Sequence, residues 1–405
     1  MIILYELSQT GLSHSEFTKA FTESIAHAFA GHQIVVYGRG SHLDAAFAAL
    51  PPVLDGRLIQ RPDVPEDFCL GDNPLLALVK TFRFLHASYG QWVSHCPLVI
   101  FLTGEPRHIL AAKLLKRLRP SLRCHLVLHG DIASLTLPRA RHPLRRFTDY
   151  TASITLANHD DIRLVTLESH IKRNLTALFP EVEPYVDVVR CPYNRGNAHW
   201  HAAIRDEEPV RFGLLGIAGR SKGLDIFARL ATEIMDAFPR AAEFRVIGKM
   251  QHGYQDLDLS AVSGPRPFSE TWLPAEVFEV ELDALRYVVL PYNMEYYAFA
   301  ASAVLLDALG WRKPLVAFRT PAICELSERF GEIGHICDSY DEMADTVTGI
   351  LSGFDPERYA AQCRNLDAAF QSRQPRAIAG EYSAVVRSRW GARFAAGAAS
   401  HPVNL

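Results

Sequence analysis

Short apolar, β-branched runs alternate with segments of helical period along most of the chain, and this alternation constrains the fold more than any other feature. Strands that alternate with helices form parallel sheets covered by helices on both faces. We therefore predict an α/β fold with a doubly wound sheet in the first half. The strand-like runs of that half lie at residues 2–5, 33–37, 97–102, 124–128, 163–167 and 186–191.

The alternation lapses in a polar, turn-rich segment at residues 192–210 and then restarts. Strand-like runs follow at residues 212–217 and 244–247, with a helical segment at 224–237 between them. A chain of 405 residues is too long for one ordinary core. We therefore predict a first domain at residues 1–195, a second domain at 196–375 and a C-terminal helical segment at 376–405.

The composition is that of a globular protein, with 48% hydrophobic and 21% charged residues. A net charge of -3 offers no general attraction to nucleic acid. No basic region precedes the N-terminal apolar run and no apolar stretch approaches about 18 residues, so we expect a cytosolic chain that neither is secreted nor spans a membrane. The seven cysteines stand singly without a CxxC spacing, which favours reduced thiols over disulfides or a zinc site.

One stretch, residues 290–317, is typical of a strand, a polar aromatic loop, a helix and a second strand. The loop and the helix start lie at the carboxyl end of a strand, which is where open parallel sheets bind ligands. The first amides of such a helix lack intrahelical partners and can bind a phosphate. Ser302 and Ala303 stand at this predicted helix start, and Asp307 follows about one turn later.

A glycine-rich loop at residues 216–223 follows the first strand of the second half and opens a helix. Glycines such as Gly216 and Gly219 remove Cβ atoms, so a diphosphate can approach the backbone closely. The ammonium of Lys222 would offset the phosphate charge. Because such turns are common in α/β proteins, the loop gains weight from its position in the same predicted domain as Asp307.

These two segments resemble the donor-site signature of GT-B glycosyltransferases, and in particular the retaining enzymes of glycosyltransferase family 4. That pattern has a Glu, seven residues, a second Glu, Ala-Leu, a Gly and Lys-Pro-Val-Val-Ala. Phe299 stands where the first acid is expected, and Ile217 stands where the family's glycine loop has an arginine. The second half of the pattern is present as Asp307, Ala308, Leu309, Gly310, Lys313, Pro314, Leu315, Val316 and Ala317.

The resemblance implies two Rossmann-like domains with a cleft between them and C-terminal helices that cross back to the first domain. It also implies a nucleotide-sugar donor, transfer with retention, and no metal or other cofactor, because protein cations act on the diphosphate instead. Lys222 and Arg220 would contact the diphosphate, and Asp307 the ribose. The implied donor-binding residues are Gly216, Gly219, Arg220, Lys222, Gly248, Ser302, Ala303 and Asp307.

In the first domain the resemblance places His129 at a strand end near the donor sugar, where an imidazole can hydrogen-bond a hydroxyl. A histidine that merely donates to a backbone carbonyl is the structural alternative. Gly11, His14, Asp131 and Glu168 are the acceptor-side candidates. Each polar one has a plainer explanation: His14 as part of an ordinary helix start, Asp131 as an N-cap and Glu168 as an acid at a helix N-terminus.

Ten basic residues and one acid, Asp131, occupy residues 107–146. Such a surface can bind an anionic bilayer at about 1 kcal/mol per cation, which would suit a lipid-linked acceptor at the inner face of a membrane. A solvated helix face with a loop is the alternative. The basic residues are Arg107, Lys113, Lys116, Arg117, Arg119, Arg123, Arg139, Arg141, Arg145 and Arg146.

The sequence thus predicts a glycosyltransferase, hexosyl or other, that moves a sugar from a nucleotide-sugar to a polysaccharide, lipid-linked or glycolipid acceptor. His129, Lys222 and Asp307 are its predicted catalytic residues. Two alternatives remain open: a non-catalytic GT-B scaffold or partner subunit, which the departures at Phe299 and Ile217 favour, and a nucleotide-sugar epimerase on the same fold.

Overall fold

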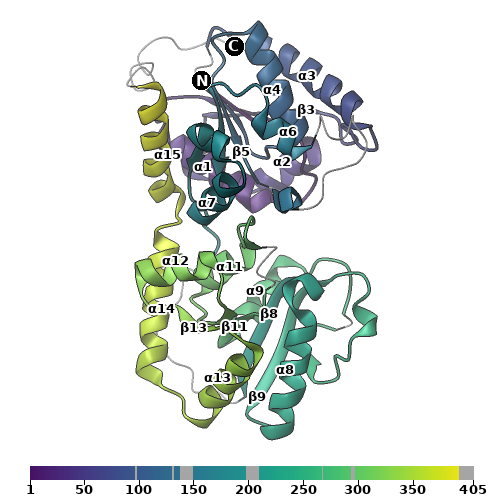
Figure 1. Cartoon of the computed structure of the whole chain (residues 1–405), viewed down its shortest axis with the longest axis vertical. Helices are drawn as coiled ribbons and strands as arrows, with labels where there is room; N and C mark the ends of the chain where they lie inside the picture. The colour runs from purple at the N-terminus through teal and green to yellow at the C-terminus, as the bar shows by residue number, and fades with distance from the viewer. Residues whose placement is uncertain are drawn as a thin grey trace. The chain divides into compact units, whose positions relative to one another are not determined.

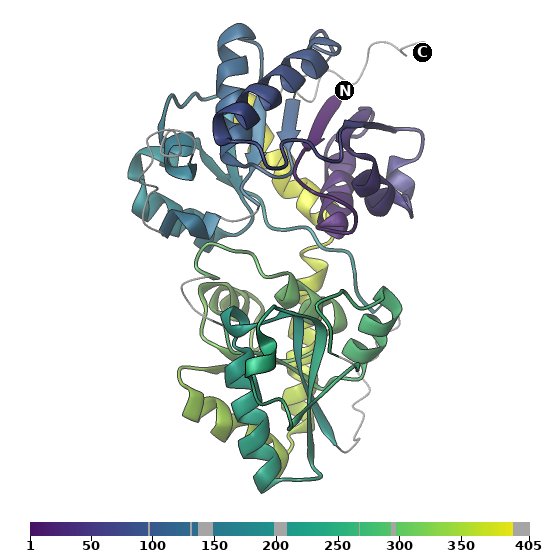
Figure 2. The same cartoon turned by 90° about the vertical axis from the view of Figure 1, so that its right-hand side faces the viewer.

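A computed structural model describes residues 1–95, 98–129, 132–136, 149–197, 209–266, 268–292 and 297–391. The chain divides into two compact units, each built around one parallel sheet with helices packed on it (Figures 1 and 2). Unit 1 comprises Met1–Asn194, Phe299–Ala301 and Arg373–Leu405. Unit 2 comprises Arg195–Ala298 and Ser302–Ser372.

The sheet of unit 1 is parallel and has the strand order β3-β2-β1-β4-β5-β6-β7. The order reverses between β1 and β4, and ligands of open α/β sheets bind beside such a switch point, at the carboxyl ends of the strands. Both of these central strands are buried along their whole length, as expected for a sheet covered on two faces. The strands are β1 Ile2–Glu6, β2 Ile34–Arg39, β3 Leu58–Val64, β4 Leu98–Phe101, β5 Cys124–Val127, β6 Ile162–Thr166 and β7 Val186–Val188.

The helices of unit 1 pack in two groups: α1, α2 and α15 in one, and α3, α4 and α6 in the other. The helix α15 belongs to this unit although it ends the described chain. Its Tyr382 is fully buried, and the hydroxyl lies 2.6 Å from Nδ1 of His125 on β5. The helices are α1 Ser15–Ala28, α2 Gly40–Phe47, α3 Pro74–Gly90, α4 Pro106–Leu118, α6 Tyr150–Thr155, α7 Ser169–Leu178 and α15 Pro375–Trp390.

The sheet of unit 2 is also parallel, with the order β10-β9-β8-β11-β12-β13 and a switch point between β8 and β11. Its core is anchored by Phe212, whose ring stacks on Phe244 at 5.2 Å and on Tyr287 at 5.6 Å. The strands are β8 Val210–Ala218, β9 Ala242–Met250, β10 Val262–Ser263, β11 Tyr287–Leu290, β12 Leu315–Phe318 and β13 Gly334–Cys337.

In unit 2, α8 and α13 pack together over the aromatic core, and α14 packs along α11 and α12. The described bounds of α8 are those predicted from its helical period. The helices are α8 Leu224–Ala237, α9 Ala275–Asp283, α11 Ala303–Trp311, α12 Pro321–Phe330, α13 Tyr340–Ser352 and α14 Pro356–Gln371. Short 3-10 helices lie at Pro52–Leu54, Ile132–Thr136 and Pro180–Tyr185 in unit 1 and at Arg220–Lys222 and Tyr254–Asp256 in unit 2.

Candidate functional site

The carboxyl edge of the unit 2 sheet brings the glycine loop against the start of α11. Gly216, near the end of β8, has φ 81°, and a Cβ built there would lie 3.2 Å from Nζ of Lys222 and 3.1 Å from Val304. Gly223 has φ 75°, and a Cβ there would lie 2.1 Å from the carbonyl oxygen of Pro291, directly after β11. Glycine at both positions therefore lets the loop reach the switch point between β8 and β11.

The ammonium of Lys222 is partly buried in this corner, and burial lowers its pKa to about 8. The carboxylate of Asp307 acts in the opposite direction but only partly offsets the desolvation. Within the described residues, the ammonium of Lys222 donates no hydrogen bond and has no carboxylate at ion-pair distance, while its backbone amide donates to the carbonyl oxygen of Gly219. A desolvated cation that lacks an anionic partner is suited to bind an anion.

The start of α11 adds hydroxyl and carboxylate groups beside this lysine. Oγ of Ser302 caps the helix by accepting from the amide of Leu305 at 3.2 Å, and it lies 3.0 Å from the hydroxyl of Tyr292. Tyr292 stacks on Tyr297 at 3.9 Å, and burial raises its pKa. Asp307, one turn into α11, interacts electrostatically with both Tyr292 and Lys222. Sequence reasoning missed the tyrosine pair, although its position directly after β11 was a usable signal.

The other predicted donor residues differ in how closely they approach this corner. Gly248, at the end of β9, has φ 146°, and a Cβ there would lie 2.0 Å from the carbonyl oxygen of Gly216. Gly219 faces the side chain of Gln251, while Ala303 is exposed as the first residue of α11. The Arg220 side chain is 63% exposed and lies 3.9 Å from Asp225, so its charge is directed to a surface ion pair.

On unit 1, the carboxyl edge of the sheet gathers three histidines from separate segments. His129 follows β5, and its ring meets His14 in a T-shaped contact at 4.4 Å. His14 has φ 55°, a left-handed conformation that is uncommon outside glycine. His42 holds the loop in place, with ring nitrogens 3.0 Å from the carbonyl oxygen of Gly11 and 3.0 Å from Oγ1 of Thr18. The predicted Gly11, His14 and His129 thus lie together.

His129 retains an unused polar atom in this group. Burial holds the pKa of its ring well below the usual value, so the imidazole is neutral at pH 7. Its Nδ1 is buried without a hydrogen-bond partner. Among the described residues Nδ1 thus makes no bond to a backbone carbonyl, and the role of His129 stays a prediction. The predicted Asp131 lies outside the described residues.

Glu168 has a structural role that its sequence position did not reveal. Its two carboxylate oxygens accept from Nη1 and Nη2 of Arg373 at 2.7 and 3.0 Å. Both side chains are buried, and Arg373 lies two residues before α15. The pair joins the end of β6 to the start of the last helix, so Glu168 serves the fold, and its place on the acceptor side stays a prediction.

The basic surface predicted along α4 is also corrected by the structure. Lys113 and Lys116 are buried rather than exposed. Nζ of Lys113 donates to the carbonyl oxygens of Ser153 and Leu156 at 2.6 Å each, and Nζ of Lys116 lies 2.6 Å from the carboxylate of Asp161. These lysines tie α4 to the segment around α6 and β6, which the helical pattern alone could not show. Arg139, Arg141, Arg145 and Arg146 lie outside the described residues.

No helix in the described ranges combines the length and the apolar character needed to cross a membrane. In the same ranges, no three His, Cys, Asp or Glu side chains gather closely enough to hold a metal ion.

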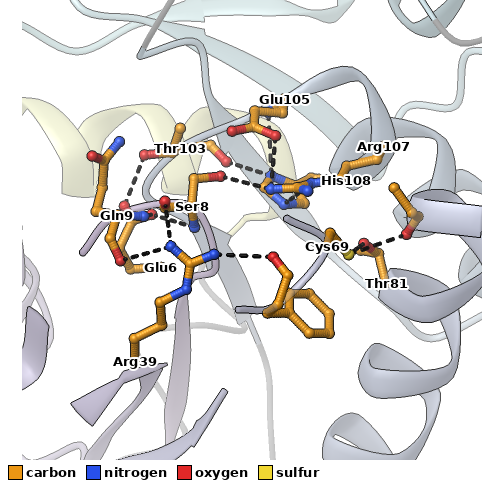
Figure 3. Close-up of polar contacts among 12 residues, drawn as sticks. Glu6, Ser8, Gln9, Arg39, Cys69, Thr81, Thr103, Glu105, Arg107 and His108 are labelled. Carbon is orange, nitrogen blue, oxygen red and sulfur yellow. Dashed lines mark hydrogen bonds and ion pairs between the residues drawn. The ribbon is translucent and has the colours of Figure 1, made fainter. Parts of the chain in front are cut away.

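A polar network at the unit 1 switch point was not anticipated (Figure 3). It joins the end of β1 to the start of α4 through Glu6, Ser8, Thr103, Arg107 and His108. The available signal was Glu6 itself, a carboxylate directly after an apolar strand. Glu6 was overlooked because it borders a predicted strand that was identified by its hydrophobic pattern alone.

No protein-family model matches the chain, and no curated protein is similar in sequence. Solved structures do show similarity. HepE from Anabaena, in complex with UDP-glucose, has a TM-score of 0.63 at 14% identity and covers 96% of this chain and 99% of its own. A glycosyltransferase from Rickettsia africae has a TM-score of 0.63 at 8% identity, with coverages of 96% and 98%.

The TarM G117R mutant from S. aureus, in complex with fondaparinux, α-GlcNAc-glycerol and UDP, has a TM-score of 0.51 at 13% identity. The similarity covers 76% of this chain and 58% of TarM. These likenesses show the fold. The chain has the GT-B fold, with two parallel-sheet α/β domains whose described strands number seven and six.

Proposed function

We propose that the chain is a glycosyltransferase that binds a nucleotide-sugar at the carboxyl edge of the unit 2 sheet. The observation that carries this proposal is the state of Lys222, a partly buried ammonium next to the backbone of Gly216 and the N-terminus of α11. A diphosphate fits this corner because the lysine and the first amides of the helix both favour negative charge. HepE with UDP-glucose and TarM with UDP are similar in fold and support this choice of ligand.

In the mechanism that we propose, the diphosphate is the leaving group. Negative charge grows on it as the glycosidic bond breaks, and Lys222 with the amides beyond Ser302 stabilises that charge. The carboxylate of Asp307 accepts hydrogen bonds from ribose hydroxyls. On unit 1, Nδ1 of His129 has no hydrogen-bond partner among the described residues and is available to a hydroxyl of a bound saccharide, because a buried ring nitrogen without a partner gains most from such a bond.

We further propose transfer with retention to a saccharide or lipid-linked acceptor held by the loop that carries Gly11 and His14. The acceptor oxygen bonds to the anomeric carbon as the bond to the diphosphate breaks, and its proton passes to the departing phosphate, so no side chain is assigned as general base. Contact with an anionic membrane would have to rest on Arg117, Arg119 and Arg123 among the described basic residues. Lys113 and Lys116 are internal, and Arg107 is bonded to Ser8 and His108. One observation favours a second function, a nucleotide-binding scaffold without transfer: Phe299 is 5% exposed and apolar where the family has its first acid.

Calorimetric titration with UDP, GDP, ADP, CDP and dTDP tests nucleotide binding. We expect one of them to bind, and Lys222→Ala to weaken that binding about 10- to 100-fold, since a hydrogen bond to a charged group contributes about 1.5–3 kcal/mol. Lys80→Ala is the matched control, because Lys80 is an exposed lysine of unit 1 paired with Asp72. Equal affinity in wild type and Lys222→Ala would contradict the proposed site.

Hydrolysis of the matching nucleotide-sugar by water separates the transferase from the scaffold. A transferase should release the nucleotide slowly without an acceptor, and Asp307→Asn should bind the donor more weakly. A chain that binds the nucleotide but never cleaves the nucleotide-sugar would support the scaffold.

A further inference from the structure

A closed ring of hydrogen bonds lies at the switch point of unit 1, between the ends of β1 and β4 (Figure 3). The amide of Ser8 donates to Oε1 of Glu6 at 3.1 Å, and Oγ1 of Thr103 donates to Oε2 at 2.8 Å. Nη2 of Arg107 donates to Oγ of Ser8 at 3.3 Å, and Nε donates to Nε2 of His108 at 3.2 Å. Nδ1 of His108 lies 2.7 Å from the carbonyl oxygen of Thr103, which closes the ring.

Because Arg107 has only donors, Nε2 of His108 accepts from it, and in the neutral ring Nδ1 then carries the proton and donates it to the carbonyl oxygen of Thr103 at 2.7 Å. The amide of Glu105 also lies 3.2 Å from Nδ1, but only an unprotonated Nδ1 could accept from it, so the two contacts at Nδ1 exclude each other. Burial lowers the pKa of His108 to about 4, so the ring is neutral at pH 7 as this arrangement requires. The only member of the ring that can change its charge near pH 7 is Glu6.

The carboxylate of Glu6 is fully buried and accepts three hydrogen bonds, the third from the amide of Gln9 at 3.2 Å. Among the described residues, no cation lies at ion-pair distance from it. Desolvation is therefore the main influence on its pKa, which rises to about 7, and the nearby carboxylate of Glu105 adds to the rise. The guanidinium of Arg39 binds the carbonyl oxygens of Ser8 and Phe68 rather than Glu6.

The ring acts on the first half of a loop whose second half is held through Gly11 by Ser41 and His42. Residues 7–14 connect β1 to α1, and at residues 8 and 9 the amides donate to Glu6 while the carbonyl oxygens accept from Arg39. Further along, His14 has φ 55°, a left-handed conformation that is strained for a residue with a Cβ and needs outside support. The backbone hydrogen bonds of the first half of the loop thus converge on Glu6 and Arg39.

We propose that Glu6, as a carboxylate, is a positioning residue that fixes residues 7–14 in the conformation that presents Gly11 and His14 to the acceptor. The role of this loop rests on the proposed function. A charged acceptor binds amides about twice as strongly as a neutral one, so the carboxylate holds Ser8 and Gln9 and the protonated acid releases them more readily. A buried carboxylate without a cationic partner lowers the stability of the fold. Because Glu6 lies at the carboxyl edge of the sheet, where such folds bind ligands, we infer that it serves function at the expense of stability.

Hydrogen exchange at the amides of residues 7–14, corrected for intrinsic base catalysis, tests this proposal without any ligand. At pH 8 we expect the wild type to protect Ser8 and Gln9 about tenfold more than Glu6→Gln, and at pH 5.5 we expect the two to be equal. Glu16→Gln is the control, because Glu16 is an exposed acid in the first turn of α1. It should behave as the wild type at both pH values.

Thr103→Val provides a second variant that keeps Glu6. Loss of the hydrogen bond to Oε2 destabilises the carboxylate, so the midpoint of the pH-dependent protection should move to higher pH. Equal protection in wild type and Glu6→Gln at pH 8 would overturn the proposal. A loss that is the same at pH 8 and pH 5.5 would also overturn it, because it would show a structural role without the charge.

A parallel titration with UDP separates this proposal from the proposed function. We expect the wild type, Glu6→Gln and Glu16→Gln to bind UDP with equal affinity, because the nucleotide residues belong to unit 2. If pH-dependent protection is found but no nucleoside diphosphate binds the wild type, the transferase is refuted and the positioning of the loop stands.

Discussion

Lys222 lies so close to Gly216 that a single added methyl group would meet its ammonium, since a Cβ on Gly216 would stand 3.2 Å from Nζ. This approach is available because residue 216 has φ 81° at the end of β8, where glycine carries no steric penalty. The backbone and the lysine therefore form one surface, and changes to either should affect the binding of the same diphosphate.

The first prediction concerns Gly216→Ala. Left-handed backbone costs an L-residue about 1–2 kcal/mol, and the new methyl group would displace Lys222 and press on Val304. We expect the free energy of unfolding to fall by at least this amount and nucleotide affinity to fall more than tenfold, as measured by urea denaturation and calorimetric titration. Gly349→Ala is the control: this glycine lies inside α13 with open space around it, and alanine should stabilise the helix by about 0.5–1 kcal/mol. Unchanged nucleotide affinity in Gly216→Ala would contradict the close approach.

The second prediction concerns the pH dependence of nucleotide binding. Because burial lowers the pKa of Lys222 to about 8, the free site loses its charge as the pH rises through that value. A bound diphosphate favours the protonated lysine, so affinity should fall about tenfold between pH 7 and pH 9. Lys222→Arg should bind with little pH dependence in this range, because a guanidinium stays charged. A wild-type affinity that is constant from pH 7 to pH 9 would show that Lys222 does not contact the anion.

Several features of this corner of unit 2 could be predicted from the sequence, because each depends on residues that are close together in the chain. The helix start at Ser302 follows from a capping residue before an apolar helix, and the glycine loop follows from a strand that ends where a helix begins. The fold class follows from the alternation of strands and helices, since a parallel sheet requires crossover helices. These features depend on neighbours within about ten residues, which periodicity and turn chemistry describe.

What the sequence did not reveal depends on partners far along the chain. Glu168 pairs with Arg373 across 205 residues, and Lys113 caps carbonyl groups about 40 residues away. A polar side chain on a helix face or at a strand end reads as exposed until its partner is known. β3 was also missed, because this edge strand is half exposed and lacks a continuous apolar pattern.

The third prediction concerns the stability of Glu6→Gln. The folded-state pKa of Glu6, about 7, lies above its ordinary value of 4.5, so the folded chain keeps this proton while the unfolded chain releases it. Stability therefore falls as the pH rises from about 4.5 to about 7, by at most about 3 kcal/mol. Glutamine removes this loss, so the variant should be more stable than the wild type at pH 8 by about 1–3 kcal/mol, and nearly equal to it at pH 4. Denaturant unfolding at the two pH values measures the difference, and Glu16→Gln is the control. If Glu6→Gln were less stable than the wild type at pH 8, the carboxylate of Glu6 would be better solvated than its full burial indicates.

The fourth prediction decides whether α4 presents a basic surface or uses its lysines internally. Nζ of Lys113 donates to Ser153, Leu156 and Asn158, so Lys113→Met would leave three acceptors without their donor. We expect the free energy of unfolding to fall by about 2–4 kcal/mol, because each buried acceptor that loses its partner retains its desolvation cost. Arg117→Met in the same helix is the matched control, since Arg117 is exposed and its loss should change stability by no more than about 0.5 kcal/mol. Co-sedimentation with anionic vesicles should respond in the opposite order, because only the exposed arginine can reach a lipid headgroup. A stable Lys113→Met that loses vesicle binding would restore the predicted membrane surface.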